Sequence, residues 1–334
     1  MDLTTTYLGL KLRNPVVGSA SPLTRDLDNI RRIEDAGGAA VVLPSHFEEQ
    51  IEQDAGQFEQ YTSVGPDSFA EALSYLPPAA AYGAGPEEYV EIIRKAHEAV
   101  TIPAIASLNG VTGAEWTRYA RLAQDAGAGA IELNVFFVPA AASLSAEQVE
   151  QYYITVLRAV KAAGTIPVSM KLSPYFTAPV RTVRVLDRAG ADGFVLFNRF
   201  LEPDMDLAAL RMRYDVPLST PVEIRLPLLW IGVMFGEVAG SLAASTGVDS
   251  SDEVIKYLLA GADVVMTTSA LLRHGTGHMR TLLTGLTEWL KAREIASVAG
   301  MRGTFSQSRL KDPVSYERAN YIKALHSWAA TGQA

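Results

Sequence analysis

Residues 252–270 read DEVIKYLLAGADVVMTTSA, and this stretch carries the pattern that decides the fold. An amphipathic segment ends at Ala260-Gly261-Ala262, and a short apolar run, DVVMT at 263–267, follows at once. Glycine just past a helix end favours the left-handed cap conformation. The run that follows is too short for a helix and too apolar for an edge strand, so the pattern predicts a buried parallel strand.

The same pattern occurs three more times along the chain. Ala36-Gly37, Ala126-Gly127 and Ala189-Gly190 each precede an apolar run, namely AAVVL at 39–43, AIELN at 130–134 and GFVLFN at 193–198. A second signal, Thr-Ile-Pro, precedes AIASLN at 104–109 and VSMKL at 168–172, because proline is tolerated at the first residue of a strand. With PVVGSAS at 15–21 and SLAAS at 241–245, the sequence predicts eight strands.

Amphipathic segments alternate with these strands, which favours a TIM (β/α)8 barrel over a doubly wound sheet. The expected helices cover residues 26–36, 86–100, 114–126, 146–163, 179–189, 228–238, 252–260 and 277–294. Two connections, residues 44–85 after the second strand and 199–227 after the sixth, are long enough to shape a site. We therefore expect one α/β barrel domain over residues 1–334, with long loops after strands 2 and 6.

Composition limits the chemistry. The 334 residues are 48% hydrophobic and include no cysteine, so redox chemistry would need a bound organic cofactor and not a disulfide or a cysteine-ligated cluster. A net charge of -8 disfavours nucleic acid and anionic membranes as partners. The N-terminus lacks the pattern of a signal peptide, and Pro227 and Glu237 interrupt the most apolar stretch, 226–244. These features predict a soluble cytoplasmic protein.

The functional site of such a barrel lies at the carboxyl ends of its strands. Apart from the second strand, which ends in Pro44-Ser45-His46, these ends carry small, hydroxyl or amide side chains and one lysine: Ser19, Ala20, Ser21, Asn109, Asn134, Lys171, Asn198, Thr246, Gly247, Thr268 and Ser269. The five histidines are scattered, so no metal site is predicted.

Lys171 is the most informative of these residues, because an ammonium at the end of an apolar strand is costly unless a polar partner meets it. The partner could be a neighbouring carboxylate such as Glu132, which would make the lysine structural. The functional alternatives are a positive charge beside a reduced cofactor and a desolvated Schiff-base amine.

The loops after the seventh and eighth strands indicate a phosphate site. Gly247 allows close approach to an anion, Ser250 and Glu253 have capping-box spacing, and Thr268-Ser269 precede another helix. Barrels commonly bind phosphate at this place, although Thr-Gly before a helix is also ordinary turn chemistry. Asn134 and Asn198 could recognise a planar ring or satisfy loop backbone, and the apolar residues 136–139 are interpreted as a packed wall.

The chain resembles the dihydroorotate dehydrogenase family of FMN barrels over most of its length. The resemblance is carried by Asn14-Pro15 with Ser19-Ala20-Ser21, by IELN at 131–134, by KLSPYF at 171–176 and by residues 252–271. It implies FMN as cofactor, held by Ser19, Ala20, Ser21, Asn134, Lys171, Thr246, Gly247, Thr268 and Ser269. Lys171 would lie near the pyrimidine end of the flavin, and Asn134 and Asn198 would lie over the ring and bind substrate.

The substrate half departs from the family pattern. The family's general base, a cysteine or serine, falls at Phe137, the next two positions are Val138 and Pro139, and a family lysine falls at Pro44. His46 is the preferred replacement base because its pKa is suited to neutral pH, with Ser143, Ser145 and Tyr175 as other candidates. The residues expected to bind the cofactor are largely retained, although Thr246-Gly247 replaces the double glycine of the family's phosphate loop.

The resemblance implies an FMN-dependent oxidoreductase acting on CH–CH donors, with dihydroorotate, and hence pyrimidine biosynthesis, as the family default. The alternatives are a Schiff-base aldolase that uses Lys171 and a flavin-binding protein without catalysis. No GxGxxG nicotinamide fingerprint is present, so we expect electrons to leave to a small molecule or a separate protein. We also expect a homodimer.

Overall fold

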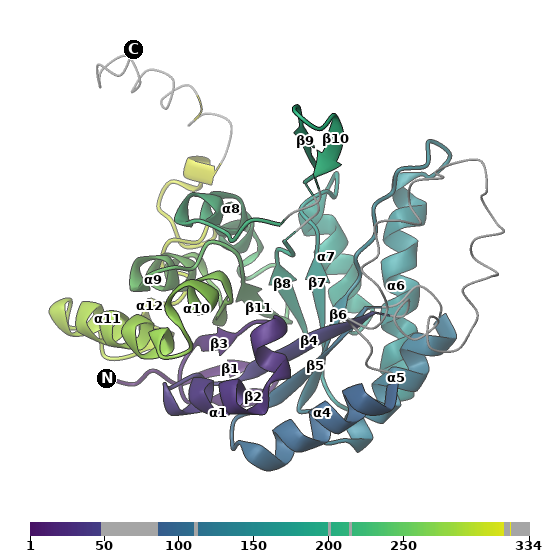
Figure 1. The fold of residues 1–334 in the computed structure, drawn as a ribbon. Coiled ribbons are helices and arrows are strands. Elements are labelled where there is room, and N and C mark those ends of the chain that lie inside the picture. The colour runs from purple at the N-terminus through teal and green to yellow at the C-terminus, as the bar shows by residue number, and fades with distance from the viewer. Residues whose placement is uncertain (48–85, 110–112, 200–201, 214–215, 317–320, 322–334) are drawn as a thin grey trace.

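A computed structural model describes residues 1–47, 86–109, 113–199, 202–213, 216–316 and 321. Its centre is a closed barrel of eight parallel strands in the order β11-β12-β3-β4-β5-β6-β7-β8 (Figure 1). The strands are β3 (Val16–Gly18), β4 (Val41–Phe47), β5 (Ala104–Asn109), β6 (Ala130–Asn134), β7 (Val168–Leu172), β8 (Gly193–Leu196), β11 (Ser241–Ala244) and β12 (Val264–Thr267). The predicted TIM (β/α)8 barrel is therefore confirmed.

The strands are continuous apolar runs because helices cover the outside of the barrel while side chains fill its inside. Every residue of β5, β6 and β7 is buried. The four Ala-Gly endings correctly predicted the strands that follow them, β4, β6, β8 and β12: Gly37, Gly127, Gly190 and Gly261 all have positive φ, between 93° and 131°. At Gly261 a Cβ would lie 2.4 Å from the Phe235 ring, so close packing as well as backbone conformation requires glycine there.

The helices lie around the barrel close to the predicted ranges (Figure 1). They are α1 (Leu27–Asp35), α4 (Pro86–Ala99), α5 (Gly113–Asp125), α6 (Ala146–Ala163), α7 (Pro179–Arg188), α8 (Arg225–Met234), α9 (Ser251–Ala260), α10 (Ser269–His274), α11 (His278–Ala292) and α12 (Val298–Met301). Helix α8 was expected at 228–238 but begins and ends earlier, because the apolar periodicity of this segment continues past Met234 while the backbone turns at Phe235.

A short hairpin closes the amino-terminal end of the barrel. Its strands, β1 (Thr5–Tyr7) and β2 (Leu10–Leu12), pair antiparallel. Tyr7, Leu8 and Leu12 are buried against interior residues of the barrel such as Val17 and Val195. The bottom of the barrel is thus packed, and the opposite end remains for a site.

The two long connections contain more structure than expected. Residues 44–47 belong to β4, which has an irregular register with β5 between Val42 and Ser45, and residues 48–85 lie outside the described part. The segment 199–227 includes a hairpin, β9 (Asp204–Asp206) with β10 (Arg211–Arg213), and a turn of helix, η4 (Pro221–Ile224). The hairpin projects away from the barrel (Figure 1).

The segment after α12 packs on the barrel's outer helices. Backbone N–H groups of Gly303, Phe305 and Gln307 donate to carbonyls of Leu258, Leu259 and Gly232, which belong to α9 and α8. Within the described ranges no helix has both the length and the apolar character needed to cross a membrane.

Candidate active site

A cavity of about 280 Å³ lies at the carboxyl ends of five neighbouring strands, β7, β8, β11, β12 and β3. The segment 216–219, which precedes η4, forms its remaining wall. The lining residues are Ser19, Ala20, Lys171, Phe197, Asn198, Arg199, Val216, Pro217, Leu218, Ser219, Ser245, Thr246, Gly247, Val248, Met266, Thr267, Thr268, Ser269 and Leu272. Eight of the predicted site residues meet here: Ser19, Ala20, Lys171, Asn198, Thr246, Gly247, Thr268 and Ser269.

Lys171, which lines this cavity, is held by a buried ion pair. Its Nζ lies 3.3 Å from Oε1 of Glu132, and the two residues are 8% and 0% exposed. The strands place them together, because β6 and β7 are neighbours with Glu132 opposite Ser169 and Asn134 opposite Lys171. The ion pair with Glu132 that was expected of a structural lysine is thus confirmed, yet Lys171 also lines the cavity.

Glu132 is the buried negative charge of the barrel interior. Its second oxygen, Oε2, has no hydrogen-bond partner among the described residues. Burial first, and then the charge of Glu132, raises the pKa of the Tyr7 hydroxyl. Burial likewise raises the pKa of Tyr89, with a smaller contribution from Glu132. Both phenols therefore stay neutral at physiological pH, and the cation that compensates Glu132 is Lys171.

Asn134 and Asn198 form a polar chain across the top of the barrel. The Asn198 amide donates to Asn134 Oδ1 at 2.7 Å, and the Asn134 amide donates to Ser45 Oγ at 3.2 Å. Ser45 in turn shares a hydrogen bond of 2.8 Å with Ser107. Asn198 reaches the cavity, whereas Asn134 is buried behind it and holds Asn198 in place.

The loop after β11 approaches its neighbours closely at Gly247. The glycine has φ +74°, and a Cβ at this position would lie 2.7 Å from Ile224 Cγ2 and 2.8 Å from the Thr220 carbonyl oxygen. Thr246 before it also has positive φ, +78°. Glycine is therefore needed at 247 by both conformation and space. The predicted capping box at the start of α9 is present, with Ser250 Oγ and N–H both donating to Glu253.

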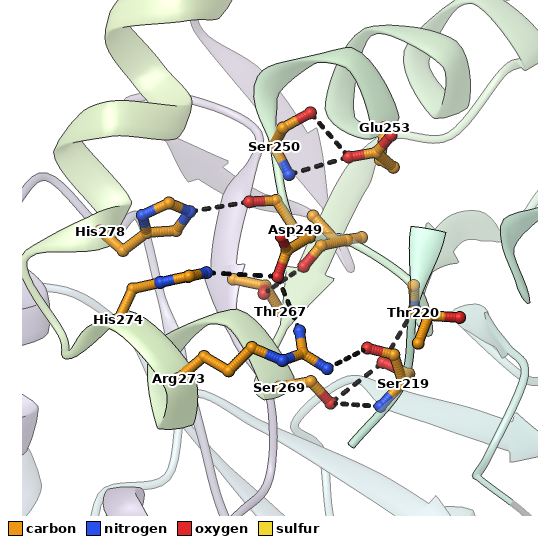
Figure 2. Close-up of polar contacts among 12 residues, drawn as sticks. Ser219, Thr220, Asp249, Ser250, Glu253, Thr267, Ser269, Arg273, His274 and His278 are labelled. Atoms are coloured by element: carbon orange, nitrogen blue, oxygen red, sulfur yellow. Dashed lines mark hydrogen bonds and ion pairs between the residues drawn. The ribbon is translucent and has the colours of Figure 1, made fainter. Parts of the chain in front are cut away.

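Ser219 forms hydrogen bonds with several residues that lie around the cavity (Figure 2). Its hydroxyl oxygen accepts the Gly247 N–H at 3.1 Å, and its own N–H donates to Ser269 Oγ at 3.0 Å. Its carbonyl accepts a hydrogen bond of 2.7 Å from Arg273, and the same guanidinium lies 2.7 Å from Asp249.

Sequence reasoning missed Ser219, Asp249 and Arg273. The three residues are widely separated along the chain, and only folding brings the loop after β11 and helix α10 against segment 216–219. One signal was available for the arginine: Arg273 follows Ser269 by four residues, so a helix starting at Ser269 places both on one face.

The remaining predicted residues lie differently. Ser21 immediately precedes the short helix η1 (Pro22–Arg25), and its carbonyl accepts the Thr24 hydroxyl at 3.0 Å. His46 belongs to β4, paired with Leu108, but its side chain lies outside the described part. Phe137 packs on Tyr152, with ring centroids 5.5 Å apart. The expected wall at 136–139 is less packed than predicted, because Phe136 and Val138 are exposed.

No cluster that could bind a metal occurs in the described part of the chain, where no three His, Asp or Glu side chains come together suitably. The cations at the cavity are instead Lys171 and Arg199, and Arg199 forms an ion pair with Glu223 of η4. The site therefore offers polar and cationic groups for an organic ligand.

Comparisons with known proteins agree with this architecture. The chain is 26% identical over 312 residues to the dihydroorotate dehydrogenase B (NAD(+)) catalytic subunit of Methanothermobacter thermautotrophicus, which covers 90% of this chain and 97% of the relative. It is 24% identical over 348 residues to the NAD-dependent dihydropyrimidine dehydrogenase subunit PreA of Escherichia coli, with 90% and 76% covered. A third relative, the dihydroorotate dehydrogenase A (fumarate) of Lacticaseibacillus paracasei, is 28% identical over 211 residues, with 62% and 71% covered.

No protein-family model matches the chain. The structure is a (β/α)8 barrel with a polar cavity at the carboxyl ends of its strands, and the proteins it resembles are named as dehydrogenases. The expected resemblance to the dihydroorotate dehydrogenase family is thereby confirmed: relatives at 25–26% identity over 90% of the chain carry that name.

Proposed function

We propose that this chain is an FMN-dependent oxidoreductase that transfers a hydride between the flavin and a small cyclic or conjugated substrate. The observation that carries the proposal is one cavity lined by a lysine, a glycine loop and two serine hydroxyls. The relatives' names place dihydroorotate and dihydropyrimidines among the substrates to be tested first.

The donor groups of the cavity are chemically suited to FMN. A phosphate needs N–H and O–H donors and a cation. Near Gly247 lie its N–H and the hydroxyls of Ser219 and Ser269, which hydrogen-bond one another here and would turn to a bound phosphate, with Arg273 beside them. A flavin ring needs a flat wall of small side chains, which Ser19 and Ala20 at the end of β3 supply. The set therefore fits a phosphorylated flavin.

Bound FMN would supply a two-electron acceptor for a hydride leaving a C–H bond. Lys171 would contribute a fixed positive charge that favours the negative charge of the reduced ring, and Glu132 holds that ammonium in place. The Schiff-base alternative would use the same Nζ, which is already engaged by the buried Glu132 carboxylate. Asn198, oriented by Asn134, would present its amide to a substrate ring.

This chain differs from the dihydroorotate dehydrogenase family at the position of the general base, the residue that removes a proton from the substrate. Phe137 occupies the position at which the family has a cysteine or serine base, and a phenyl ring accepts no proton. Ser145, one of the other candidates, is the N-cap of α6 and accepts the Gln148 N–H. His46 remains our first proposal for a base. We propose that dihydroorotate is oxidised slowly at best, and that a substrate with a more acidic C–H bond is preferred.

The decisive experiment is the absorbance spectrum of the purified protein and the mass of the molecule released on denaturation. We expect a yellow protein that releases FMN and not FAD. A colourless protein that takes up no FMN on reconstitution would overturn the proposal. Borohydride trapping of a carbonyl compound on Lys171 would instead establish the aldolase alternative.

The electron acceptor is proposed to be a small molecule or a separate protein, consistent with relatives whose names describe subunits of NAD-dependent enzymes. Anaerobic stopped-flow with fumarate, NAD and artificial acceptors, after photoreduction of the flavin, would distinguish these routes. The homodimer and the cytoplasmic location stay predictions, and sedimentation analysis and cell fractionation would test them.

A further inference from the structure

Arg273 connects three parts of the chain that meet at one end of the cavity. It belongs to α10, which follows β12; one guanidinium nitrogen lies 2.7 Å from Asp249 Oδ1, after β11, and another donates at 2.7 Å to the Ser219 carbonyl. Figure 2 shows the guanidinium between these two partners. We call this arrangement of Arg273, Asp249 and Ser219 the arginine bridge.

The arginine bridge determines where the Ser219 hydroxyl lies. Ser219 is buried, and its N–H and hydroxyl both contact Ser269 Oγ at 3.0 Å while the hydroxyl oxygen accepts the Gly247 N–H. Arg273 fixes the carbonyl side of the same residue. Three donor groups, the Gly247 N–H and the hydroxyls of Ser219 and Ser269, are thus held together at one place, where Gly247 donates to Ser219 and Ser219 donates to Ser269.

The bridge also places a cation beside those donors. Asp249 offsets part of the charge, and His274 lies 3.5 Å from the same carboxylate oxygen, while the His278 ring is 2.7 Å from the Asp249 carbonyl. Glu253, the nearby acid of α9, is engaged by Ser250 and by Lys256. The Arg273 guanidinium therefore carries a permanent positive charge directly beside Ser219.

We propose that Arg273 is a positioning residue for the cofactor's phosphate: through Ser219 it aligns the three donors, and its charge gives the site a preference for phosphorylated over unphosphorylated flavin. The proposal rests on the proposed function. It adds a residue outside the cavity wall, and it predicts an effect on the phosphate end of the ligand alone.

The test is a titration of the apoprotein with FMN and, separately, with riboflavin. Quenching of the flavin fluorescence measures binding in both titrations. For wild type we expect tighter binding of FMN. Arg273→Met should raise the Kd for FMN about tenfold or more while that for riboflavin changes less than about twofold. Arg188→Met is the matched control, because Arg188 is exposed at the end of α7, and both Kd values should be unchanged.

Two further measurements keep the result interpretable. Arg273→Lys keeps the charge and one donor, so the Kd for FMN should rise only about threefold, and this variant substitutes for Arg273→Met if the latter does not fold. Raising the salt concentration should weaken FMN binding to wild type more than to Arg273→Met, because the charge term is screened.

The outcomes separate the two proposals. Equal loss of FMN and riboflavin affinity in the Arg273 variants would show a merely structural role and overturn the inference, as would unchanged FMN affinity or identical salt dependence. In those cases wild type still binds FMN and the proposed function stands. If wild type binds neither flavin, the proposed function fails with it.

Discussion

Replacing Lys171 with methionine should destabilise the barrel strongly, whatever ligand the site binds. Met has a similar length but no charge, so the substitution leaves the Glu132 carboxylate, 0% exposed, without the cation 3.3 Å away. Oε2 of Glu132 already lacks a partner among the described residues. A buried charge that loses its only compensation is costly to retain, whereas removing both charges together is not.

The expected size follows from the burial. Breaking a buried ion pair from one side costs about 3–5 kcal/mol, and an unfolding entropy of about 2.1 cal/mol/K per residue amounts to about 0.7 kcal/mol/K for 334 residues. Lys171→Met should therefore lower the Tm by about 4–7 °C. The double variant Lys171→Met/Glu132→Gln should recover most of this loss, since a neutral amide replaces the stranded charge.

The assay is thermal unfolding by calorimetry or circular dichroism on apoprotein, with Lys161→Met as matched control. Lys161 pairs with Asp192 at 2.7 Å, but the two side chains are 30% and 36% exposed, so its loss should cost at most about 1 kcal/mol. A Lys171→Met protein as stable as the control, or a double variant no more stable than the single one, would refute the reasoning.

Three other predictions concern separate parts of the molecule. Burial tends to raise the pKa of Glu34, but hydrogen bonds from Thr101 and the next N–H outweigh it and lower the pKa below its usual 4.5. A carboxyl whose folded pKa is depressed stabilises the fold above its unfolded pKa, and this stabilisation is lost as the pH falls through the folded pKa. Glu34→Gln should therefore cost at most about 1 kcal/mol at pH 7 and progressively less as the pH falls below 4.5, measured by urea unfolding. Phe137→Ser should raise the rate at which dihydroorotate reduces the flavin by about 10²-fold in anaerobic stopped-flow, and fast reduction by wild type would contradict the absence of a base there. Gly247→Ala, whose Cβ would lie 2.7 Å from Ile224, should lower both Tm and FMN affinity, and unchanged values in melting and fluorescence titration would show that the loop can move aside.

Local sequence determined the barrel, because each of its signals acts over a few residues. The Ala-Gly endings have positive φ in all four cases, and the apolar runs that follow them are buried strands. Parallel strands with helices between them can bury both faces in few ways, so eight repeats led to the closed barrel. The ends of those strands then place Lys171 and Gly247 at one face of the barrel.

Contacts between distant segments were decided only by the tertiary structure. No pattern within 199–227 predicted that Ser219 would return to bond Gly247 and Ser269, or that Arg273 would join it to Asp249. The hairpin β9–β10 was missed because its residues are mostly exposed and carry no apolar alternation of buried strands. The sequence by itself determined which residues stand at the ends of strands, since periodicity and turn chemistry are local. The partners of those residues depend on chain closure around the barrel, which brings together atoms far apart in sequence through packing of the whole fold.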